Sequence, residues 1–191
     1  SIWDGKKWSE PKQLTNDNRG ESNPCVALLD NGQAICVFNY LPKSTGKSID
    51  EMFNQAEIAY SIWDGKSWSE PKLLLEGGTP EHMDMFPKIA DDGDKAAVVW
   101  LCDNDTNVFT VNNRTLQAAI WDEGKWDFVG KTETSIVSAP ISLTYKNGKA
   151  TCFYIIDEDG KIDGDNPSVR EDQHAYVRTF DKTGWKSPQR I

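Results

Sequence analysis

The sequence has no long apolar run, no cluster of lysines and arginines, and few residues that bind soft metals. No stretch approaches the roughly 18 consecutive apolar residues of a membrane helix, which excludes a helical membrane-spanning protein. Acidic residues outnumber basic ones by 30 to 21, and the net charge of −9 argues against nucleic-acid binding. The two histidines and four cysteines include no Cys-x-x-Cys pair, which argues against a structural zinc site.

Hydrophobic residues are also scarce, at 38% of the 191 residues, whereas glycine and proline contribute 14 and 9. The chain is nevertheless long enough for one domain, or a run of repeats, with a real core. Its composition favours short elements joined by frequent turns. The one helix signal is Ser48-Ile-Asp-Glu51, a capping-box pattern that predicts one or two helical turns.

A repeat of about 59 residues is the main feature of the sequence. Its first two copies, 1–14 and 61–74, are nearly identical and begin Ser-Ile-Trp-Asp-Gly-Lys-x-Trp. Two looser copies follow later in the chain. The aligned aspartates and tryptophans of the four copies are Asp4, Trp8, Asp64, Trp68, Asp122, Trp126, Asp181 and Trp185.

A second motif runs out of phase with the first and begins near Pro24, Pro87 and Pro140. Each copy leads through an Asn-Gly or Asp-Gly turn into an apolar run. A period near 59 with four short apolar runs is typical of a four-stranded propeller blade. In the first complete blade we expect strands at 24–29, at 33–40, at 57–63 and from Trp68.

These patterns predict an all-β protein, a β-propeller segment of about three four-stranded antiparallel blades plus a half-blade. The half-blade is 1–14, and the blades are 15–74, 75–133 and 134–191. Three blades make an arc, so further blades or a second chain must complete the ring. The half-blade favours a piece of a longer propeller.

The cysteines are predicted to be small buried residues rather than disulfide partners. Cys25 and Cys36 flank an Asn-Gly turn. A two-residue hairpin there sets Cys25 opposite Phe38 and Cys36 opposite Ala27. The two thiols then lie diagonally, which is a poor geometry for a disulfide.

The Ser-Ile-Trp-Asp-Gly-Lys-x-Trp turn resembles the Asp-box, or BNR, repeat of the sialidase-like propellers. That family's pattern is Ser-x-Asp-x-Gly-x-Thr-Trp, at the hairpin between the third and fourth strands of a blade. Ser1 and Ser61 lie one position further from the aspartate than in the family, whereas Asp122-x-Gly124 keeps the family spacing. The resemblance implies a propeller fold in which these boxes are scaffolding, away from the catalytic face.

Sialidases of this family grip the substrate carboxylate with three arginines and use a Tyr–Glu pair and an acidic catalyst. No residue set here matches that site, so no catalytic residue is carried over. We expect Arg114 and Arg170 in long loops. Arg178 aligns with Ser61 and Ala119 in the third strand, where a charge must be paired or reach an edge. It is either a functional carboxylate grip or, as we favour, an ion pair or end-blade surface residue.

Two sets of loops lie on one face of the predicted propeller, the long-loop face, and together carry nearly all of the net charge of −9. The long loops between second and third strands are expected at 41–56, 103–114 and 157–173, and the loops between consecutive blades at 15–23, 76–86 and 131–136. Loops longer than about 12 residues in a compact domain are commonly functional. This face is therefore the predicted binding face, although solubility alone also explains its charge.

The third of these loops is a candidate calcium site. It holds Asp157, Asp159, Asp163 and Asp165 among turn residues, and hard cations prefer such oxygen ligands. Asp103 and Asp105 form a smaller version in the preceding blade. A solvated acidic loop is the favoured alternative.

Seven of the eight tryptophans lie inside the repeated turns. Packing between sheets requires such repetition, and so does a multivalent glycan-binding protein. We favour packing, because large aromatic side chains dominate core burial.

The leading hypothesis is a non-catalytic propeller module of a larger extracellular or cell-surface protein. It binds a glycan, a cation or a protein through its long-loop face. The alternative is part of the catalytic propeller of a sialidase-like glycoside hydrolase, and a third hypothesis is a spacer in an adhesin-like protein.

Overall fold

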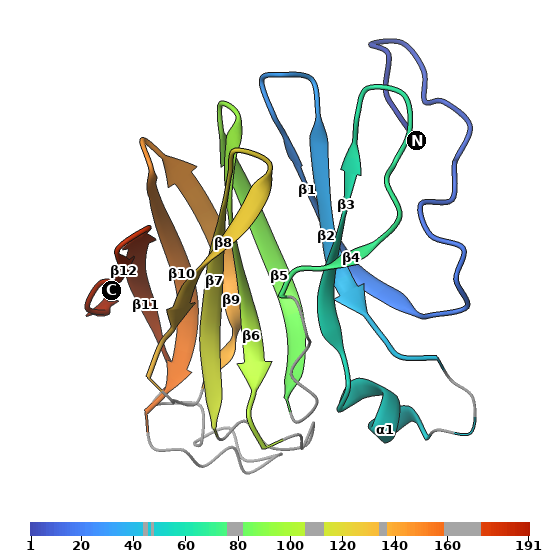
Figure 1. Cartoon of the computed structure of the whole chain (residues 1–191). Coiled ribbons are helices and arrows are strands. Elements are labelled where there is room, and N and C mark those ends of the chain that lie inside the picture. Colours follow the sequence, from blue (N-terminus) through green and yellow to red (C-terminus); the bar gives the residue numbers. More distant parts are fainter. Residues whose placement is uncertain (44–45, 47, 76–81, 106–112, 134–136, 159–172) are drawn as a thin grey trace.

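The chain forms three four-stranded antiparallel sheets that stand next to one another as the blades of a β-propeller, in an arc that does not close (Figure 1). The structure is a computed structural model. It describes residues 1–43, 46, 48–75, 82–105, 113–133, 137–158 and 173–191. The all-β prediction of about three four-stranded blades is confirmed.

Each sheet is built from strands in chain order, so every strand pairs with its sequence neighbour. The first sheet contains β1 (Glu21–Leu28), β2 (Ala34–Tyr40), β3 (Glu57–Trp63) and β4 (Lys72–Leu73). The second contains β5 (Met83–Asp92), β6 (Lys95–Asp103), β7 (Arg114–Asp122) and β8 (Lys125–Lys131). The third contains β9 (Val137–Lys146), β10 (Lys149–Asp157), β11 (Gln173–Asp181) and β12 (Gly184–Trp185), and β13 (Gln189–Arg190) also pairs with β11.

The predicted helix is present as α1 (Ile49–Phe53), between β2 and β3. The Ser48 backbone N–H donates to Oε2 of Glu51 over 2.7 Å, and the Glu51 N–H donates to Oγ of Ser48 over 3.2 Å. This reciprocal pair is the capping box that the sequence predicted. At five residues, the one helix in the described ranges is too short to cross a membrane.

The core lies in two interfaces between sheets. The first seam joins the first and second sheets, and the second seam joins the second and third. Because the second sheet is covered on both faces, β6 and β7 are buried along nearly their whole length and read as continuous apolar runs. The largest buried side chains include Ile35, Val98 and Trp100 in the first seam and Leu101, Leu116, Ile120 and Phe180 in the second.

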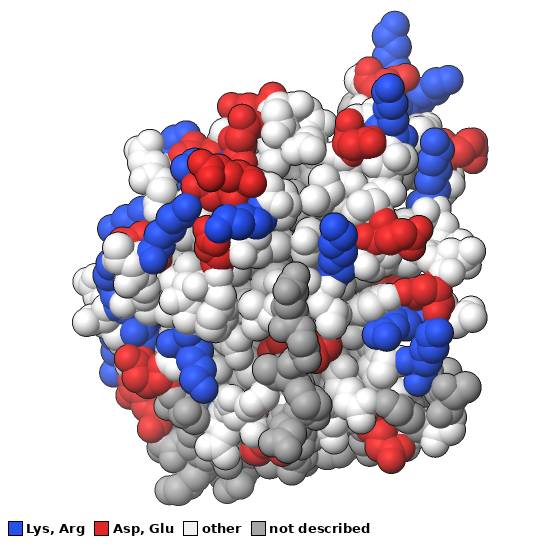
Figure 2. Space-filling model, in the orientation of Figure 1, with Lys and Arg blue, Asp and Glu red and all other residues white. Residues whose placement is uncertain are grey.

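On one face of the propeller segment, the hairpin turns of neighbouring sheets bond to each other. The backbone N–H of Asn31 donates to Oδ1 of Asp94 over 2.9 Å across the first seam. Across the second seam, Asp92 accepts the Asn147 N–H over 2.6 Å and pairs with Lys146. Acidic and basic side chains are interspersed over this end of the molecule (Figure 2).

The predicted two-residue hairpin between β1 and β2 was wrong by one residue. Cys36 lies opposite Val26, and Cys25 lies opposite Val37. The Leu29 N–H bonds to the Gln33 carbonyl, so the loop has three residues and ends on Gly32, whose φ is +82°. A three-residue hairpin places glycine at that left-handed position.

The same Asn-Gly dipeptide forms a different turn between β9 and β10. Asn147 and Gly148 both have positive φ, at 51° and 76°, and Lys146 pairs with Lys149 across a two-residue loop. This is the primed turn that Asn-Gly favours. At β1–β2, by contrast, the bond from the Asn31 N–H to Asp94 of the next sheet fits the longer loop.

Cysteine burial agrees with the sequence prediction. Cys36, Cys102 and Cys152 are buried, Cys25 is half-buried, and all four are free thiols. Burial raises the pKa of the Cys36 and Cys152 thiols to about 11 and about 12. They therefore pack as small apolar side chains.

The repeated turns use their aspartates and tryptophans in a regular way. Asp4 and Asp64 each accept two backbone N–H bonds from the turn that follows, at 2.8–2.9 Å. Asp122 differs, because Lys95 and Lys182 bind it at 3.0 and 2.7 Å. In all four copies an aromatic pair faces across the hairpin, with ring centroids 4.5–5.8 Å apart.

The two ends of the arc leave apolar side chains uncovered. On the first sheet, Val26 and Leu28 are 57% and 68% exposed, while Leu14 packs over part of the same face. On the third sheet, Phe153 is 36% exposed. Similar faces inside the arc are buried by the next sheet.

Candidate functional site

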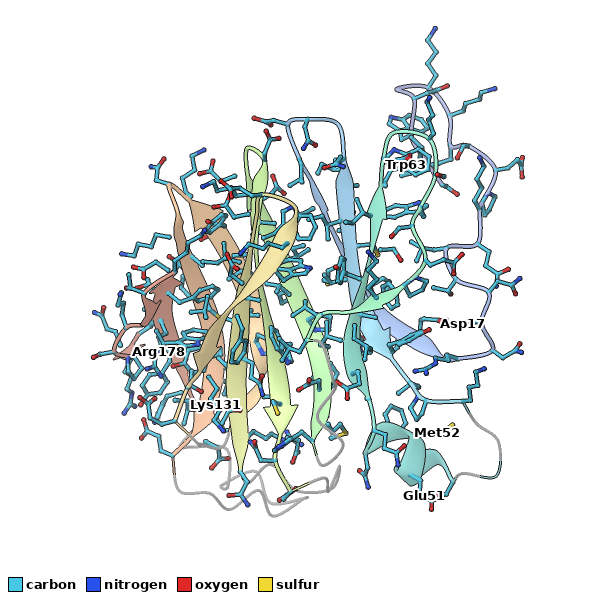
Figure 3. The ribbon with its side chains drawn as sticks, viewed as in Figure 1. Asp17, Glu51, Met52, Trp63, Lys131 and Arg178 are labelled. Carbon is cyan, nitrogen blue, oxygen red and sulfur yellow. The ribbon has the colours of Figure 1, made fainter. Side chains whose placement is uncertain are left out.

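Arg178 lies in β11 and is almost fully buried toward the second seam (Figure 3). Its Nη1 and Nη2 atoms are 2.7 and 3.3 Å from the two carboxylate oxygens of Glu133. Its Nε donates to the Lys186 carbonyl, and its guanidinium lies 5.6 Å from the Trp185 ring centroid. The hydrogen bonds from Arg178 hold the pKa of Glu133 below its usual range. Arg178 thus forms an ion pair, which the sequence analysis favoured over a substrate grip.

The other described arginines lie in separate parts of the arc. Arg114, expected in a loop, is the first residue of β7, where Asp103 directly opposite neutralises it at 2.8 Å. That pairing explains why a charged residue can begin a buried strand. Arg190 is on the edge strand β13, and Arg19 lies over a ring of the first sheet. Arg170 falls outside the described residues.

The predicted calcium loop is only partly described. Asp157 ends β10 and is buried, and Nε2 of Gln173 donates to its Oδ2 over 3.2 Å. Asp159, Asp163 and Asp165 fall outside the described residues. Calcium binding there stays a prediction.

The smaller acidic pair is engaged by its own chain. Asp103 is fully buried, and its Oδ2 contacts Arg114. Its Oδ1 accepts the Asp105 backbone N–H over 3.2 Å. Within the described ranges, no group of three or more His, Cys, Asp or Glu side chains is placed to hold a metal ion.

Sequence reasoning missed Asp84, a carboxyl group that is only 2% exposed. It was assigned to a loop at 76–86, whereas β5 already begins at Met83. Asp84 lies opposite Cys102 in the register, on the side of the second sheet that carries Trp100 into the first seam. The apolar Met-Asp-Met-Phe alternation around it was the available signal for a strand.

Burial raises the pKa of Asp84 to about 7, and the nearby Glu57 adds to the rise. Cys102 and Trp100 lie close enough to oppose it, yet Oδ1 of Asp84 has no well-aligned hydrogen bond within the described part of the chain. Asn39 of the first sheet fixes the backbone here, donating to the Asp84 carbonyl over 3.2 Å. A buried carboxyl with a pKa near neutrality suits either proton transfer or a pH-sensitive interface.

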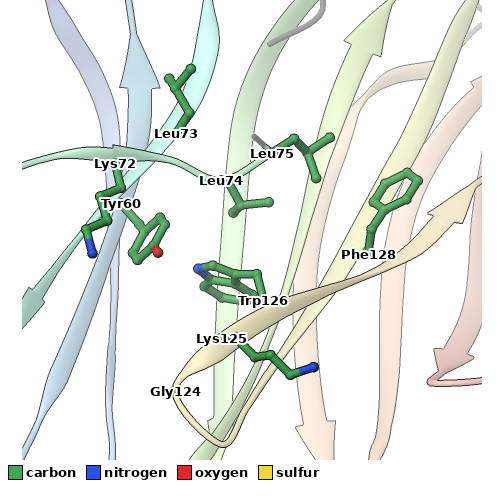
Figure 4. A pocket seen from close by; sticks show the side chains of 9 residues that line it. All are labelled: Tyr60, Lys72, Leu73, Leu74, Leu75, Gly124, Lys125, Trp126 and Phe128. Atoms are coloured by element: carbon green, nitrogen blue, oxygen red, sulfur yellow. The ribbon is translucent and has the colours of Figure 1, made fainter. Parts of the chain in front are cut away.

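A groove of about 650 Å³ opens on the outer rim of the first seam, between β4 and β8 (Figure 4). The rings of Tyr60 and Trp126 lie next to each other, 6.0 Å apart, and Phe128 lies further along β8. Lys72 runs alongside Tyr60. The lining residues are Tyr60, Lys72, Leu73, Leu74, Leu75, Gly124, Lys125, Trp126 and Phe128.

Two pairs of equivalent positions in the first and second sheets carry residues of different size, and this difference explains why the first seam is open and the second is closed. Tyr60 pairs with Lys72 in the first sheet as Ala118 pairs with Gly130 in the second. Beside the small pair, the Trp185 indole comes close enough to donate to the Gly130 carbonyl over 3.1 Å. Beside the large pair, Nε1 of Trp126 is buried and finds no partner among the described residues.

No family model matches the chain, and no curated protein matches it. Several solved structures, however, resemble it in three dimensions. A GH93 α-L-arabinofuranosidase of Fusarium graminearum superposes with a TM-score of 0.61 at 11% identity, over 93% of this chain and 51% of that one. A Hadza microbial sialidase gives 0.58 at 11% identity, over 89% and 38%.

The chain has a sialidase-like β-propeller fold. A family 117 glycoside hydrolase of the marine bacterium Zobellia galactanivorans adds a TM-score of 0.56 at 15% identity, over 91% of this chain and 56% of that one. The chain thus spans about two fifths to just over half of these three enzymes. At such low identity the likeness establishes the sialidase-like propeller and no activity.

Proposed function

We propose that this chain is a carbohydrate-binding, non-catalytic segment of a sialidase-like propeller. Of the three ligand classes that the sequence left open, a glycan is favoured because the similar structures are enzymes that act on glycosides. Such a role suits an extracellular or cell-surface protein.

The distribution of arginines carries the non-catalytic part of the proposal. A sialidase-type site needs several guanidinium groups that converge on one substrate carboxylate. Here Arg178 and Arg114 are each bound to a carboxylate of the chain itself, Glu133 and Asp103, at 2.7 and 2.8 Å. Both guanidinium groups are therefore already engaged by carboxylates of the chain rather than open to the carboxylate of a ligand.

The test compares binding with hydrolysis on the same preparation. The chain is applied to an array of neutral and acidic glycans, and it is separately incubated with chromogenic sialosides and arabinosides. We expect retention on a defined subset of glycans and no release of the chromophore. Release above the no-protein rate, abolished by Asp84→Asn, would contradict the proposal.

A second candidate function, part of a catalytic propeller, is favoured by Asp84 alone. Its carboxyl group lies on β5, within reach of Cys102 and Trp100, and its pKa of about 7 suits a general acid. Its 2% exposure instead favours a structural role in the seam. Recovery of glycosidase activity in a longer protein containing this segment, with loss on Asp84→Asn at a melting temperature no lower than that of wild type, would establish the catalytic function.

We also propose that further blades or a second chain complete the ring. Uncovered Val26, Leu28 and Phe153 at the ends of the arc support this. Light scattering on a sizing column tests it. A particle of twice the 21.5 kDa chain mass indicates closure by a second copy, whereas a monomer indicates that additional blades are needed.

A further inference from the structure

The groove on the rim of the first seam is large enough for a small ligand. Its volume of about 650 Å³ lies within the range of about 300–1,000 Å³ of small-molecule sites. Phe128, on its wall, is 50% exposed although it is a large apolar ring. Exposing this ring to water is unfavourable. A ligand that stacks on it, next to Tyr60 and Trp126, would remove that unfavourable exposure.

The closed second seam supplies the independent comparison. There the indole N–H of Trp185 is satisfied by Gly130, and Arg178 covers the ring. In the first seam the equivalent N–H of Trp126 is buried without a partner among the described residues. The Trp126 ring instead lines the open groove, so it is available for stacking, whereas Arg178 covers the equivalent ring of Trp185.

The charges around the groove select the kind of ligand. Lys72 and Lys125 are the charged residues that line it, and both are basic. Lys125 contacts Asp127 at 3.0 Å, whereas Lys72 makes no ion pair within the described ranges. The chain as a whole carries a net charge of −9, so this part of the rim is a local exception. Charge complementarity therefore favours an anionic ligand.

We propose that the groove between β4 and β8 binds an acidic sugar, a pyranose unit whose carboxylate is held by Lys72. The apolar face of the sugar stacks on Trp126 and Phe128. This inference rests on the proposed carbohydrate-binding function and names its site, on the propeller rim rather than on the long-loop face.

The experiment is isothermal titration calorimetry with a matched pair of ligands, trigalacturonate and α-1,4-linked galactotriose. They differ at C6, which is a carboxylate in one and a hydroxymethyl group in the other. We expect trigalacturonate to bind at least tenfold more tightly, with an affinity that falls as salt rises. Lys72→Gln should remove most of this preference and most of the salt dependence. Equal affinities for the two ligands would overturn the anionic assignment.

A matched pair of variants locates the site. Phe128→Ala removes a groove wall that is already half exposed, and it should weaken binding at least tenfold while lowering the melting temperature by no more than about 2–4 °C. Phe153→Ala removes a similarly exposed ring from the third sheet, outside the groove, and should leave binding unchanged. Trp126→Phe keeps an aromatic ring but reduces the surface for stacking, and it should weaken binding several-fold.

The outcomes also separate this inference from the proposed function. Binding that ignores Phe128→Ala and Lys72→Gln overturns the groove and leaves carbohydrate binding standing. The same holds if neither trisaccharide binds while other glycans on the array do. Failure on the whole array overturns both.

Discussion

The two seams of this propeller segment are built from equivalent strands and yet differ in character. In the second seam, small residues at Ala118 and Gly130 let Trp185 approach and form a hydrogen bond. In the first, Tyr60 and Lys72 at the matched positions keep Trp126 away, and a groove remains. Two side-chain volumes decide whether a repeated interface becomes a sealed core or an accessible site.

The seams also differ in how they bury charge. The second seam encloses Arg178, whose positive charge is compensated by Glu133. The first encloses Asp84, which has no cationic partner among the described residues and whose pKa is raised to about 7 by burial. A paired charge is compatible with a permanent interface, whereas an unpaired carboxyl makes the first seam sensitive to pH.

The largest expected effect on stability comes from removing a buried ring from the second seam. Phe180 is fully buried, 4.5 Å from the Trp185 ring, and Phe180→Ala should lower the free energy of unfolding by about 3–5 kcal/mol. Phe128→Ala in the open groove removes the same ring and should cost about 1 kcal/mol or less, because that ring is half exposed. Urea denaturation measures both. Equal losses would mean that the seams do not differ in packing.

The next effect is the pH dependence of Asp84. Its pKa is about 7 in the folded chain against 3.8 as a model value, so the folded state binds a proton that the unfolded state has released. The resulting stabilisation is complete below about pH 4 and is lost as the pH rises through 7. It amounts to at most about 4 kcal/mol. Asp84→Asn should therefore stabilise the chain relative to wild type at pH 8 more than at pH 4.

A carboxylate whose pKa is lowered rather than raised provides the control. Backbone N–H groups of Ser67 and Lys66 lower the pKa of exposed Asp64. Its stabilisation is present above the ordinary aspartate pKa and is lost as the pH falls through its lowered value. Melting temperatures across pH 3–9 should show opposite slopes for Asp84→Asn and Asp64→Asn, each relative to wild type. Parallel slopes would contradict the assigned pKa directions.

A smaller effect should follow from making the closed seam resemble the open one. Ala118→Tyr introduces the side chain found at the matched position 60, and it should cost about 1–3 kcal/mol through overpacking. Loss of the Trp185–Gly130 bond should appear as a change in near-ultraviolet circular dichroism. Ala118→Val, a smaller increase in volume, is the graded control. An unchanged stability would show that side-chain size at this position does not set the seam.

The smallest effect concerns calcium. Millimolar calcium should raise the melting temperature by a few degrees through binding to the folded state at the 157–165 loop. Asp159→Ala should abolish this shift, whereas Asp105→Ala should retain it. A melting temperature that ignores calcium would end the hypothesis.

The repeat, with its period near 59, was enough to predict three four-stranded sheets, because alternating apolar runs and Gly-containing turns are local signals. The capping box at Ser48 was predicted for the same reason. Hairpin register could not be predicted in this way, since the same Asn-Gly dipeptide gives a three-residue loop at Gly32 and a two-residue loop at Gly148. A bond from the neighbouring sheet accompanies the longer loop.

The candidate site was harder to predict than the fold. The tryptophans were recognised as repeated, but their spacing does not reveal which of them lacks a hydrogen-bond partner. That depends on residues at positions 60, 72, 118 and 130, which meet the tryptophans only across a seam. Asp84 was missed because its burial comes from a sheet that precedes it in the chain.

The first two copies of the repeat show where sequence alone stops. In both, aspartate accepts the same two backbone N–H bonds, and the paired tryptophan rings lie 5.6 and 5.8 Å apart. Yet Trp8 is 66% exposed, whereas Trp68 is half-buried against the first sheet. The sequence by itself determined the turn, because its bonds span only a few residues. Burial was decided by the tertiary structure, because it requires a neighbouring sheet that no local sequence can supply.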